Sequence, residues 1–454
     1  MKDKTVDMTR GKIMPQLIRF AIPVLIGALF QRVYYFADTY IVGKYLGDEA
    51  LAAVSIAGCG SFLIFSIMMG LTSGVSVVIA QYYGAGDEVK VRQTFASSIY
   101  VMVWCTAIIT LVGVIGAKPL LKIMQTSDVL FSDAYTYLLV MFIGAFGTML
   151  YNWIASVMRA LGNSVVPLFF LLVSSVLNIL LDIVFVGIIP MGVGGAAFAT
   201  VLAQVISGVL CLVYAWRALP MIRMKRTEMV CDSYIAKMIL RYGIPTGLQM
   251  SIISISDMTL QSKINTYGTD LVVAYGVCMK VEGLGWDIST SIGTAVGTFV
   301  GQNIGAGDFE RVRKGVQSAY LVNLVCFLGF IPAVWMFAEK IMKMFTENTQ
   351  SIQYGIEYMQ IFSAFFLAGG FLGIYHNMLR SAGDVFITVM MGVSEVVVRI
   401  GLTFLLAMVF GYYGLWWVSP ITWVCATMVG AIRYYSGTWK KKAQSLIVQE
   451  AVHE

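Results

Sequence analysis

The sequence predicts an all-α integral membrane protein with twelve transmembrane helices, arranged as two six-helix lobes that are related by an internal repeat. Composition gives the first indication: hydrophobic residues make up 58% of the 454 residues and charged residues only 12%, whereas soluble proteins carry about 25% charged residues. Apolar runs of roughly 20 residues or more, the length that crosses a bilayer, follow one another along the chain. The third observation is that the chain contains one pattern twice.

The repeat is marked by three short motifs that return in the same order. Two of them return at an offset of 221 residues and the third at almost the same offset, which is hard to obtain by chance. In a doubled membrane bundle the substrate site commonly lies between the halves. The motif AQYYGAGD and its copy GQNIGAGD each end in an aspartate that we expect to cap the next helix. The pairs are Ala80–Asp87 with Gly301–Asp308, Arg159–Gly162 with Arg380–Gly383, and Ala21–Pro23 with Gly243–Pro245.

Twelve apolar runs long enough to cross a bilayer can be placed along the sequence, six in each half of the repeat. Several of them exceed the length of a bare span, which indicates tilted helices or helices that extend into water. The predicted runs are 15–44, 50–82, 91–116, 131–160, 165–188, 192–218, 234–267, 271–303, 312–338, 352–381, 385–410 and 414–438.

A polar segment between the sixth and seventh runs divides the chain into lobes. We predict a first lobe at 1–218, a cytoplasmic linker at 219–233, and a second lobe with a cytoplasmic tail at 234–454. Most lysine and arginine residues fall on one side of the predicted membrane, so the positive-inside rule places both termini in the cytoplasm. With six runs per lobe, the repeats are then parallel and related by an axis along the membrane normal.

Several classes of function lack the residues that they need. The seven cysteines are scattered without a C-x-x-C pair, and two histidines offer little material for a metal site or a catalytic triad. The glycine-rich motifs lack the pattern of a nucleotide-binding loop. No basic patch is interleaved with aromatic residues as in nucleic-acid binding. We therefore expect no enzyme, no catalytic residue, no cofactor and no nucleic-acid partner, and we expect an ion gradient as the energy source.

Two aspartates lie deep within predicted spans, where an unpaired charge is unfavourable and usually functional. Asp38 lies in the first run, and Asp182 lies in the fifth run, four residues after Asn178. This spacing places Asn178 and Asp182 on one helix face. Thr200 follows a stretch of small residues in the sixth run that allows helices to approach closely. If these three helices meet, the four side chains form an oxygen-rich pocket for a cation.

Such a pocket suits either of two ions. Two neighbouring buried carboxyl groups cannot both ionise at low cost, so the pair can take up and release a proton. The same oxygens can coordinate Na⁺, and the choice between H⁺ and Na⁺ stays open; no other metal is expected. The alternative for Asn178 and Asp182 is a structural role between helices, and Arg32 is an alternative partner for Asp38.

The second half of the chain does not duplicate this pocket. Thr259 and Thr403 stand at the positions equivalent to the two aspartates. Glu395 and Arg399 are spaced for an internal ion pair, which leaves Glu282 as the acid with a candidate role in substrate contact. Aromatic faces attract cations, and aromatic residues make up 13% of the chain. The candidate residues of the substrate cavity are Gln31, Tyr34, Tyr35, Asn152, Glu282 and Trp286.

An ordered set of motifs along the whole chain resembles the multidrug and toxic compound extrusion (MATE) family of bacterial transporters. Each motif is weak alone, but their order is specific to this family. The matching elements are Gln31-x6-Asp38-Thr39, Val42-Gly43-x3-Gly47, Leu51–Val54, Ala80-Gln81-x2-Gly84-Ala85, Arg159–Gly162, Asn178-x3-Asp182, Gly195-Ala196-Ala197-x2-Thr200, Lys280-Val281-Glu282 and Val300–Gly307.

The resemblance implies a cation-coupled antiporter, driven by H⁺ or Na⁺, that exports amphipathic and often cationic drugs through alternating access of the two lobes. It implies a cation site at Asp38, Asn178, Asp182 and Thr200, and a multi-pass protein of the bacterial inner membrane. We expect organic cations or amphipathic drugs and membrane lipids as partners, and a monomer. The alternative is a flippase of lipid-linked precursors from the wider superfamily, although the extra spans and strongly basic cavity typical of flippases are absent from the sequence.

Overall fold

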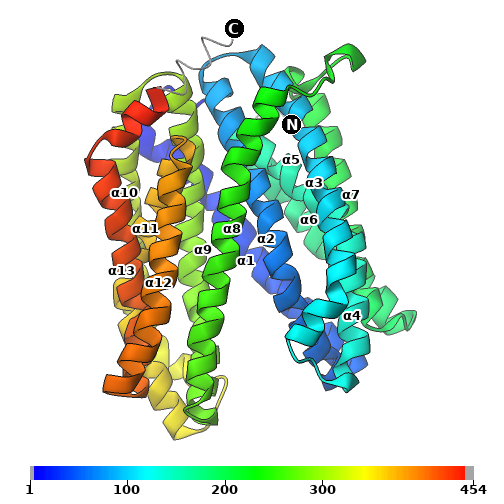
Figure 1. The fold of residues 1–454 in the computed structure, drawn as a ribbon, viewed down its shortest axis with the longest axis vertical. Coiled ribbons are helices and arrows are strands. Elements are labelled where there is room, and N and C mark those ends of the chain that lie inside the picture. The colour runs from blue at the N-terminus through cyan, green and yellow to red at the C-terminus, as the bar shows by residue number, and fades with distance from the viewer. Residues whose placement is uncertain (1–4, 445–454) are drawn as a thin grey trace. The chain divides into compact units, whose positions relative to one another are not determined.

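The computed structural model describes residues 5–444, and these residues form helices joined by turns without any β-strand (Figure 1). The predicted ends of the two lobes, 1–4 and 445–454, lie outside the described residues. The first half contains α1 Ile13–Leu46, α2 Asp48–Gly84, α3 Glu88–Ile123, α4 Asp128–Ile143, α5 Ala145–Ala160, α6 Val165–Asp182, the π-helix η1 Ile183–Ile188 and α7 Gly192–Ala218.

The second half begins after two short 3-10 turns and has one unbroken helix, α11, at the repeat position of α4 and α5. The elements are η2 Pro220–Ile222, η3 Arg226–Glu228, α8 Ser233–Asn265, α9 Thr269–Gly305, α10 Phe309–Lys343, α11 Thr349–Ser381, α12 Val385–Phe410 and α13 Tyr412–Tyr435.

The twelve-span prediction is confirmed. Within the described residues, nine helices are long and apolar enough to cross a membrane, and α4 with α5 forms a tenth span that is bent by 49°. The remaining two spans are α8 and α9, which are as long as the others and carry charged residues along their length. The bend at Gly144 was not predicted, because the run 131–160 is apolar on both sides of it.

The helices form two compact units. The first unit comprises Ile26–Ser251 and the segment up to Asp7, and the second comprises Met8–Leu25 and the chain from Ile252 onward. Thus α1 and α8 each contribute one part to each unit. The lobe and linker boundaries drawn from the sequence stay a prediction, since these units are defined by contacts and not by the repeat.

The repeat motifs build the same turn in both halves. Asp87 Oδ1 accepts a hydrogen bond from the backbone N–H of Lys90, and Asp308 Oδ1 accepts one from Arg311, each at 2.8 Å. The glycine before each aspartate has a positive φ, 75° in one half and 73° in the other, which favours glycine. The predicted helix caps are therefore confirmed at both copies.

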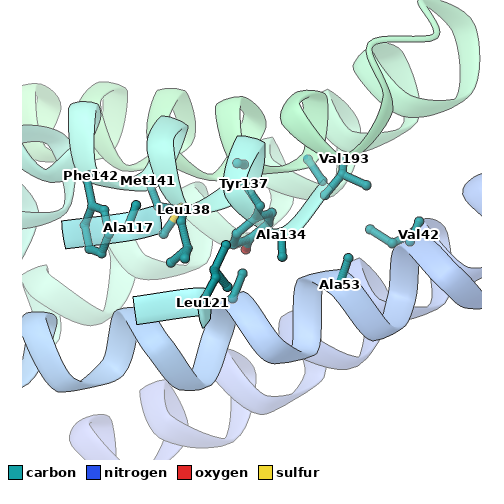
Figure 2. Packing of buried hydrophobic residues seen from close by; sticks show 14 of the residues in the cluster. Val42, Ala53, Ala117, Leu121, Ala134, Tyr137, Leu138, Met141, Phe142 and Val193 are labelled. Atoms are coloured by element: carbon teal, nitrogen blue, oxygen red, sulfur yellow. The ribbon is translucent and has the colours of Figure 1, made fainter. Parts of the chain in front are cut away.

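In the first unit, an apolar cluster joins α1, α2, α3, α4 and α7 (Figure 2). Tyr137 of α4 lies within this cluster beside Ala134 and Leu138. Close packing of these side chains against the neighbouring helices fixes the rotation of α4 about its axis. As a consequence, Tyr137 lies in the interior close to Asp38 and Asp182.

Small residues allow α2 to approach the first part of α8 closely within the same unit. A Cβ atom added at Gly70 would lie 2.3 Å from the backbone nitrogen of Gly247, and one at Gly74 would lie 2.5 Å from the carbonyl oxygen of Ile239. One turn before Gly70, the hydroxyl of Ser66 bonds that of Ser251 at 2.5 Å. Such small-residue crossings are typical of packed membrane helices.

In the second unit, α9 packs along α11, and aromatic rings of the two helices contact each other, as Trp286 does with Phe366. The N-terminal segment is tied to the same unit through a fully buried Met8. Its backbone N–H donates to Gln302 Oε1 at 2.9 Å, and its carbonyl oxygen accepts from Asn303 Nδ2 at 3.1 Å. The polar residues of the second repeat motif thus satisfy the backbone of the segment that precedes α1.

Candidate functional site

The four predicted cation-site residues meet inside the first unit. Asp38 lies on α1, Asn178 and Asp182 on the last two turns of α6, and Thr200 on α7. All four are buried, with exposed fractions from 0% for Asp182 to 8% for Asp38. The sequence pattern explains the placement, because residues four apart on α6 share a face and the small residues before Thr200 let α7 approach.

The Asn178 amide connects the other polar groups. In the orientation that satisfies both ends of the amide, Nδ2 donates to Asp182 Oδ2 at 3.1 Å, while Oδ1 accepts from the backbone N–H and the hydroxyl of Thr200, each at 3.2 Å. The π-helix η1 begins directly after Asp182. Such π-helical turns are rare and frequently lie at functional sites.

The two carboxyl groups lie within hydrogen-bonding reach of each other. One oxygen of each, Oδ1 of Asp38 and Oδ1 of Asp182, has no hydrogen-bond partner among the described protein groups. Within residues 5–444, neither of these two carboxyl groups forms an ion pair. Arg32 is therefore not the salt-bridge partner of Asp38. Two buried acids in contact cannot both be charged at low cost. A shared proton, or a cation bound by the two unpaired oxygens, would compensate this pair.

Aromatic residues that the sequence analysis did not assign to the cation site surround the acids. Tyr137 lies close to both aspartates, and Tyr34 lies close to Asp38. The sequence predicts substrate contact for Tyr34 and no role for Tyr137. No sequence signal marks Tyr137, because its position depends on how α4 packs in the apolar cluster of Figure 2.

A small polar cavity of about 30 Å³ adjoins the acids. Its lining includes three of the predicted substrate residues, Gln31, Tyr34 and Asn152, beside Asn178 and Thr200. A volume of this size holds about one water molecule and is far below the roughly 300–1,000 Å³ of drug-sized pockets. The remaining lining residues are Tyr151, Leu171, Ser174, Ser175 and Gln204.

Spacing could have found two of these missed residues. Ser174 lies four residues before Asn178 on α6, and Gln204 lies four residues after Thr200 on α7, so each shares a helix face with a predicted residue. Tyr35 does not line the cavity: it is 52% exposed, and its ring packs against that of Tyr34 in a tilted arrangement with centroids 4.4 Å apart. The structure therefore does not bring Tyr35 into the cavity.

The other two predicted substrate residues belong to the second unit and form a cluster of their own. Glu282 is 6% exposed and accepts hydrogen bonds from the Tyr358 hydroxyl at 2.9 Å and from Trp286 Nε1 at 3.4 Å. Tyr358 in turn stacks on Trp416 with centroids 4.6 Å apart. Glu282 is thus enclosed by aromatic residues whose polar atoms hold it in place.

Comparison with known proteins then identifies the family. The MatE family model matches residues 23–184 and again residues 245–405, which is well over half of the chain. The chain belongs to the MatE family. The two matches begin at Pro23 and Pro245, which the internal repeat already pairs. The resemblance read from the motifs is confirmed, and each half of the repeat is one copy of the MatE unit.

Curated and solved members of the family resemble this MatE chain along its whole length. The probable multidrug resistance protein YpnP of Bacillus subtilis is 28% identical over 96% of this chain and 98% of its own length. The multidrug export protein MepA of Staphylococcus saprophyticus is 22% identical and covers 96% of each. A multidrug resistance MATE transporter of the MOP superfamily, solved in an outward-facing conformation, superposes with a TM-score of 0.87 at 24% identity over 97% of this chain and 100% of its own. The last match supports the two-lobe helical fold.

Proposed function

We propose that this MatE protein is an antiporter that exchanges H⁺ or Na⁺ for amphipathic, often cationic compounds. The observation that carries the proposal is the buried pair Asp38 and Asp182, with one orphan oxygen each and no fixed cation. A buried carboxyl pair is retained in a membrane protein when an ion compensates it for part of a cycle. Asn178 and Thr200 supply the neutral oxygens and hydrogen bonds that orient the pair.

Helix α1 provides the physical connection between ion and substrate. Gln31, Tyr34 and Asp38 are spaced three and four residues apart, so they lie along one face of α1. An ion that holds Asp38 against Asp182 fixes that face against α6 and keeps the adjoining cavity at about 30 Å³. Release of the ion leaves two acids that repel each other, which favours separation of α1 from α6 and a larger cavity. Ion and substrate then prefer different conformations, which is the condition for exchange.

The substrate class rests on the relatives and on the composition. Curated relatives are named multidrug resistance or export proteins, and 27 methionines with abundant aromatic residues offer adaptable apolar surfaces. We place the protein as a monomer in the bacterial plasma membrane with both termini in the cytoplasm, following the distribution of basic residues.

The proposal is tested by transport of a fluorescent organic cation into proteoliposomes under a pH gradient or a Na⁺ gradient imposed separately. Transport driven by one gradient, and lost in Asp182→Asn, is the expected result. Asp133→Asn, the same chemical change on an exposed position of α4, is the matched control. If neither gradient drives any cation tested in the wild-type protein, the antiporter proposal is wrong and lipid-linked substrates should be tried.

A further inference from the structure

A second polar pocket lies in the second unit, separate from both acidic clusters. Its volume is about 190 Å³, and it is formed where the start of α10, the end of α13 and a short helix at 438–444 meet. All three elements are at the membrane face that the basic residues mark as cytoplasmic. The polar residues that line it are Arg313, Gln317, Tyr320, Tyr434, Tyr435 and Lys440.

Tyr434, one of the residues that line this pocket, carries a buried hydroxyl group without a partner among the described residues. Tyr434 is only 7% exposed, and its hydroxyl is buried with no hydrogen bond. The nearby Tyr320 hydroxyl, by contrast, donates to that of Tyr375 at 2.8 Å. Buried polar atoms in proteins nearly always have a partner, so an unpaired one at a pocket wall indicates a ligand.

The Tyr434 side chain is held rigidly in this position. Its ring stacks on that of Trp439 with centroids 6.0 Å apart and an interplanar angle of 6°. The indole Nε1 of Trp439 donates to the carbonyl oxygen of Tyr434 at 3.1 Å, and Trp439 also contacts Phe309 at the start of α10. The short helix at 438–444 is therefore anchored by Trp439, and the hydroxyl of Tyr434 is preorganised and not free to turn away.

The charged side chains that the described part of the chain contributes to the lining are both positive. Arg313 and Lys440 lie on opposite elements of the pocket, and within the described residues neither forms an ion pair. Lys440 Nζ lies 5.8 Å from the centroid of the Trp439 ring, which limits its range of positions. Among residues 5–444, no carboxylate lines the pocket. An acceptor that carries negative charge satisfies Arg313, Lys440 and the Tyr434 hydroxyl together.

The surroundings indicate where that anion comes from. Ile432 and Tyr435, on the same end of α13, are 69% and 73% exposed on the surface that a membrane helix turns to lipid. Trp, Tyr and Lys side chains are typical of the membrane–water interface, and basic pockets between membrane helices on this side bind anionic head groups. We propose that the pocket binds the phosphate group of an anionic phospholipid, with the acyl chains along the exposed face of α13.

The proposal is tested by native mass spectrometry of the purified full chain with phosphatidylglycerol or phosphatidylcholine. We expect phosphatidylglycerol to bind more tightly, and the double variant Arg313→Gln/Lys440→Gln to weaken that binding about tenfold or more. Tyr434→Phe, which removes only the unpaired hydroxyl, should weaken it about threefold. Lys441→Gln, the same charge change one residue away and outside the pocket lining, should leave it unchanged. Intrinsic fluorescence in the absence of lipid checks that each variant is folded.

Equal binding of the two lipids, or full phosphatidylglycerol binding by the double variant, would overturn the proposal. If the double variant does not fold, Lys440→Gln and Tyr434→Phe give the same test. Glycerol 3-phosphate distinguishes the two sources of a phosphate group: failure to displace the lipid supports a phospholipid ligand, and displacement at similar concentration supports a site for free phosphate esters. The readout is independent of transport, so it stands whether or not the antiporter proposal holds.

Discussion

The polar groups between α1 and α6 in the first half differ from those between the equivalent helices α8 and α12 in the second half. In the first half, α1 and α6 bring together Asp38 and Asp182, two acids without a fixed cation. In the second half, the equivalent helices α8 and α12 are joined by Arg399, whose guanidinium pairs with Glu395 at 2.8 Å and with Asp257. At the repeat offset, Arg399 stands at the position of Asn178. The second half supplies its own cation, whereas the acids of the first half have none among the described residues, and this is where we propose that the coupling ion binds.

The residues at the positions equivalent to the two aspartates also differ in their hydrogen bonding. Their equivalents Thr259 and Thr403 donate hydrogen bonds to the carbonyl oxygens one turn earlier, at 3.1 and 2.7 Å. A hydroxyl satisfied in this way needs no further partner, whereas an ionised carboxylate has no proton to donate to its own helix. The comparison teaches that one fold carries two different polar interiors: a guanidinium lies between the acids of the second half, and the acids of the first half have none. It also supports an exchangeable cation in the first half alone.

The largest effect is expected from Asp182→Asn. This change removes one of the two acids, so ion release no longer creates repulsion, and gradient-driven export should fall to background. Since Asn can keep the hydrogen bonds around Asn178, the fold should be retained. Transport in proteoliposomes and the unfolding temperature check the two parts. Normal export by this variant would contradict the difference between the halves.

A large effect on stability is expected from Arg399→Asn. Removing one partner of a buried ion pair costs about 3–5 kcal/mol, because Glu395 is left buried without its counter-charge. The double variant Glu395→Ser/Arg399→Asn carries the residues of the first half, Ser174 and Asn178, and should regain most of the loss. Thermal unfolding in detergent measures both. Equal losses in the single and double variants would show that the pair is not what stabilises this region.

A smaller effect on transport is expected from Glu282→Gln. Glutamine can still accept a hydrogen bond from Tyr358, so the aromatic cluster should persist, and export should stay within about tenfold of wild type because the acid pair of the first half is untouched. Initial transport rates at several gradients provide the measurement. Complete loss of coupling would move the cation site, or part of it, to the second half.

Thr200→Val should weaken the apparent affinity for the coupling ion by about fivefold, since a lost hydrogen bond is worth about 1 kcal/mol. The hydroxyl bonds Asn178, which orients Asp182. Thr200→Ser keeps the hydroxyl and should restore the affinity. Measuring export against ion concentration separates affinity from maximal rate. A loss in the serine variant equal to that in the valine variant would assign the effect to packing.

The smallest effect should be the same in both halves. Asp87→Ala and Asp308→Ala each remove one helix cap and should each destabilise the protein by about 1 kcal/mol. Because the two caps have the same geometry, thermal unfolding should show similar losses. Clearly unequal losses would indicate that the repeat differs in more than its polar interior.

Sequence pattern was sufficient for features that depend on local spacing. The repeat, the caps and the ion pair of Glu395 with Arg399 follow from spacing along the chain. The meeting of Asp38 with Asp182 depends on contact between α1 and α6, which the family resemblance implied and spacing did not. Features that depend on packing were missed: Tyr137 reaches the acids through the rotation of α4, and the bend at Gly144 has no local marker.

The residue types around the cavity did not predict its volume. Aromatic and amide residues around Gln31 predicted substrate contact, yet the structure shows a space of about 30 Å³ beside the cation residues. Cavity volume depends on how helices close around polar groups, and the identity of those groups does not determine it.

The most direct test of the central claim is ion release on substrate binding. A transported organic cation is added to purified protein in weakly buffered detergent solution, and released H⁺ is followed with a pH indicator or released ²²Na⁺ is counted. Reciprocal coupling predicts release of about one ion per chain in wild type and in Glu282→Gln, and none in Asp182→Asn. Release by Asp182→Asn equal to that of wild type would contradict a cation site built on the acids of the first half.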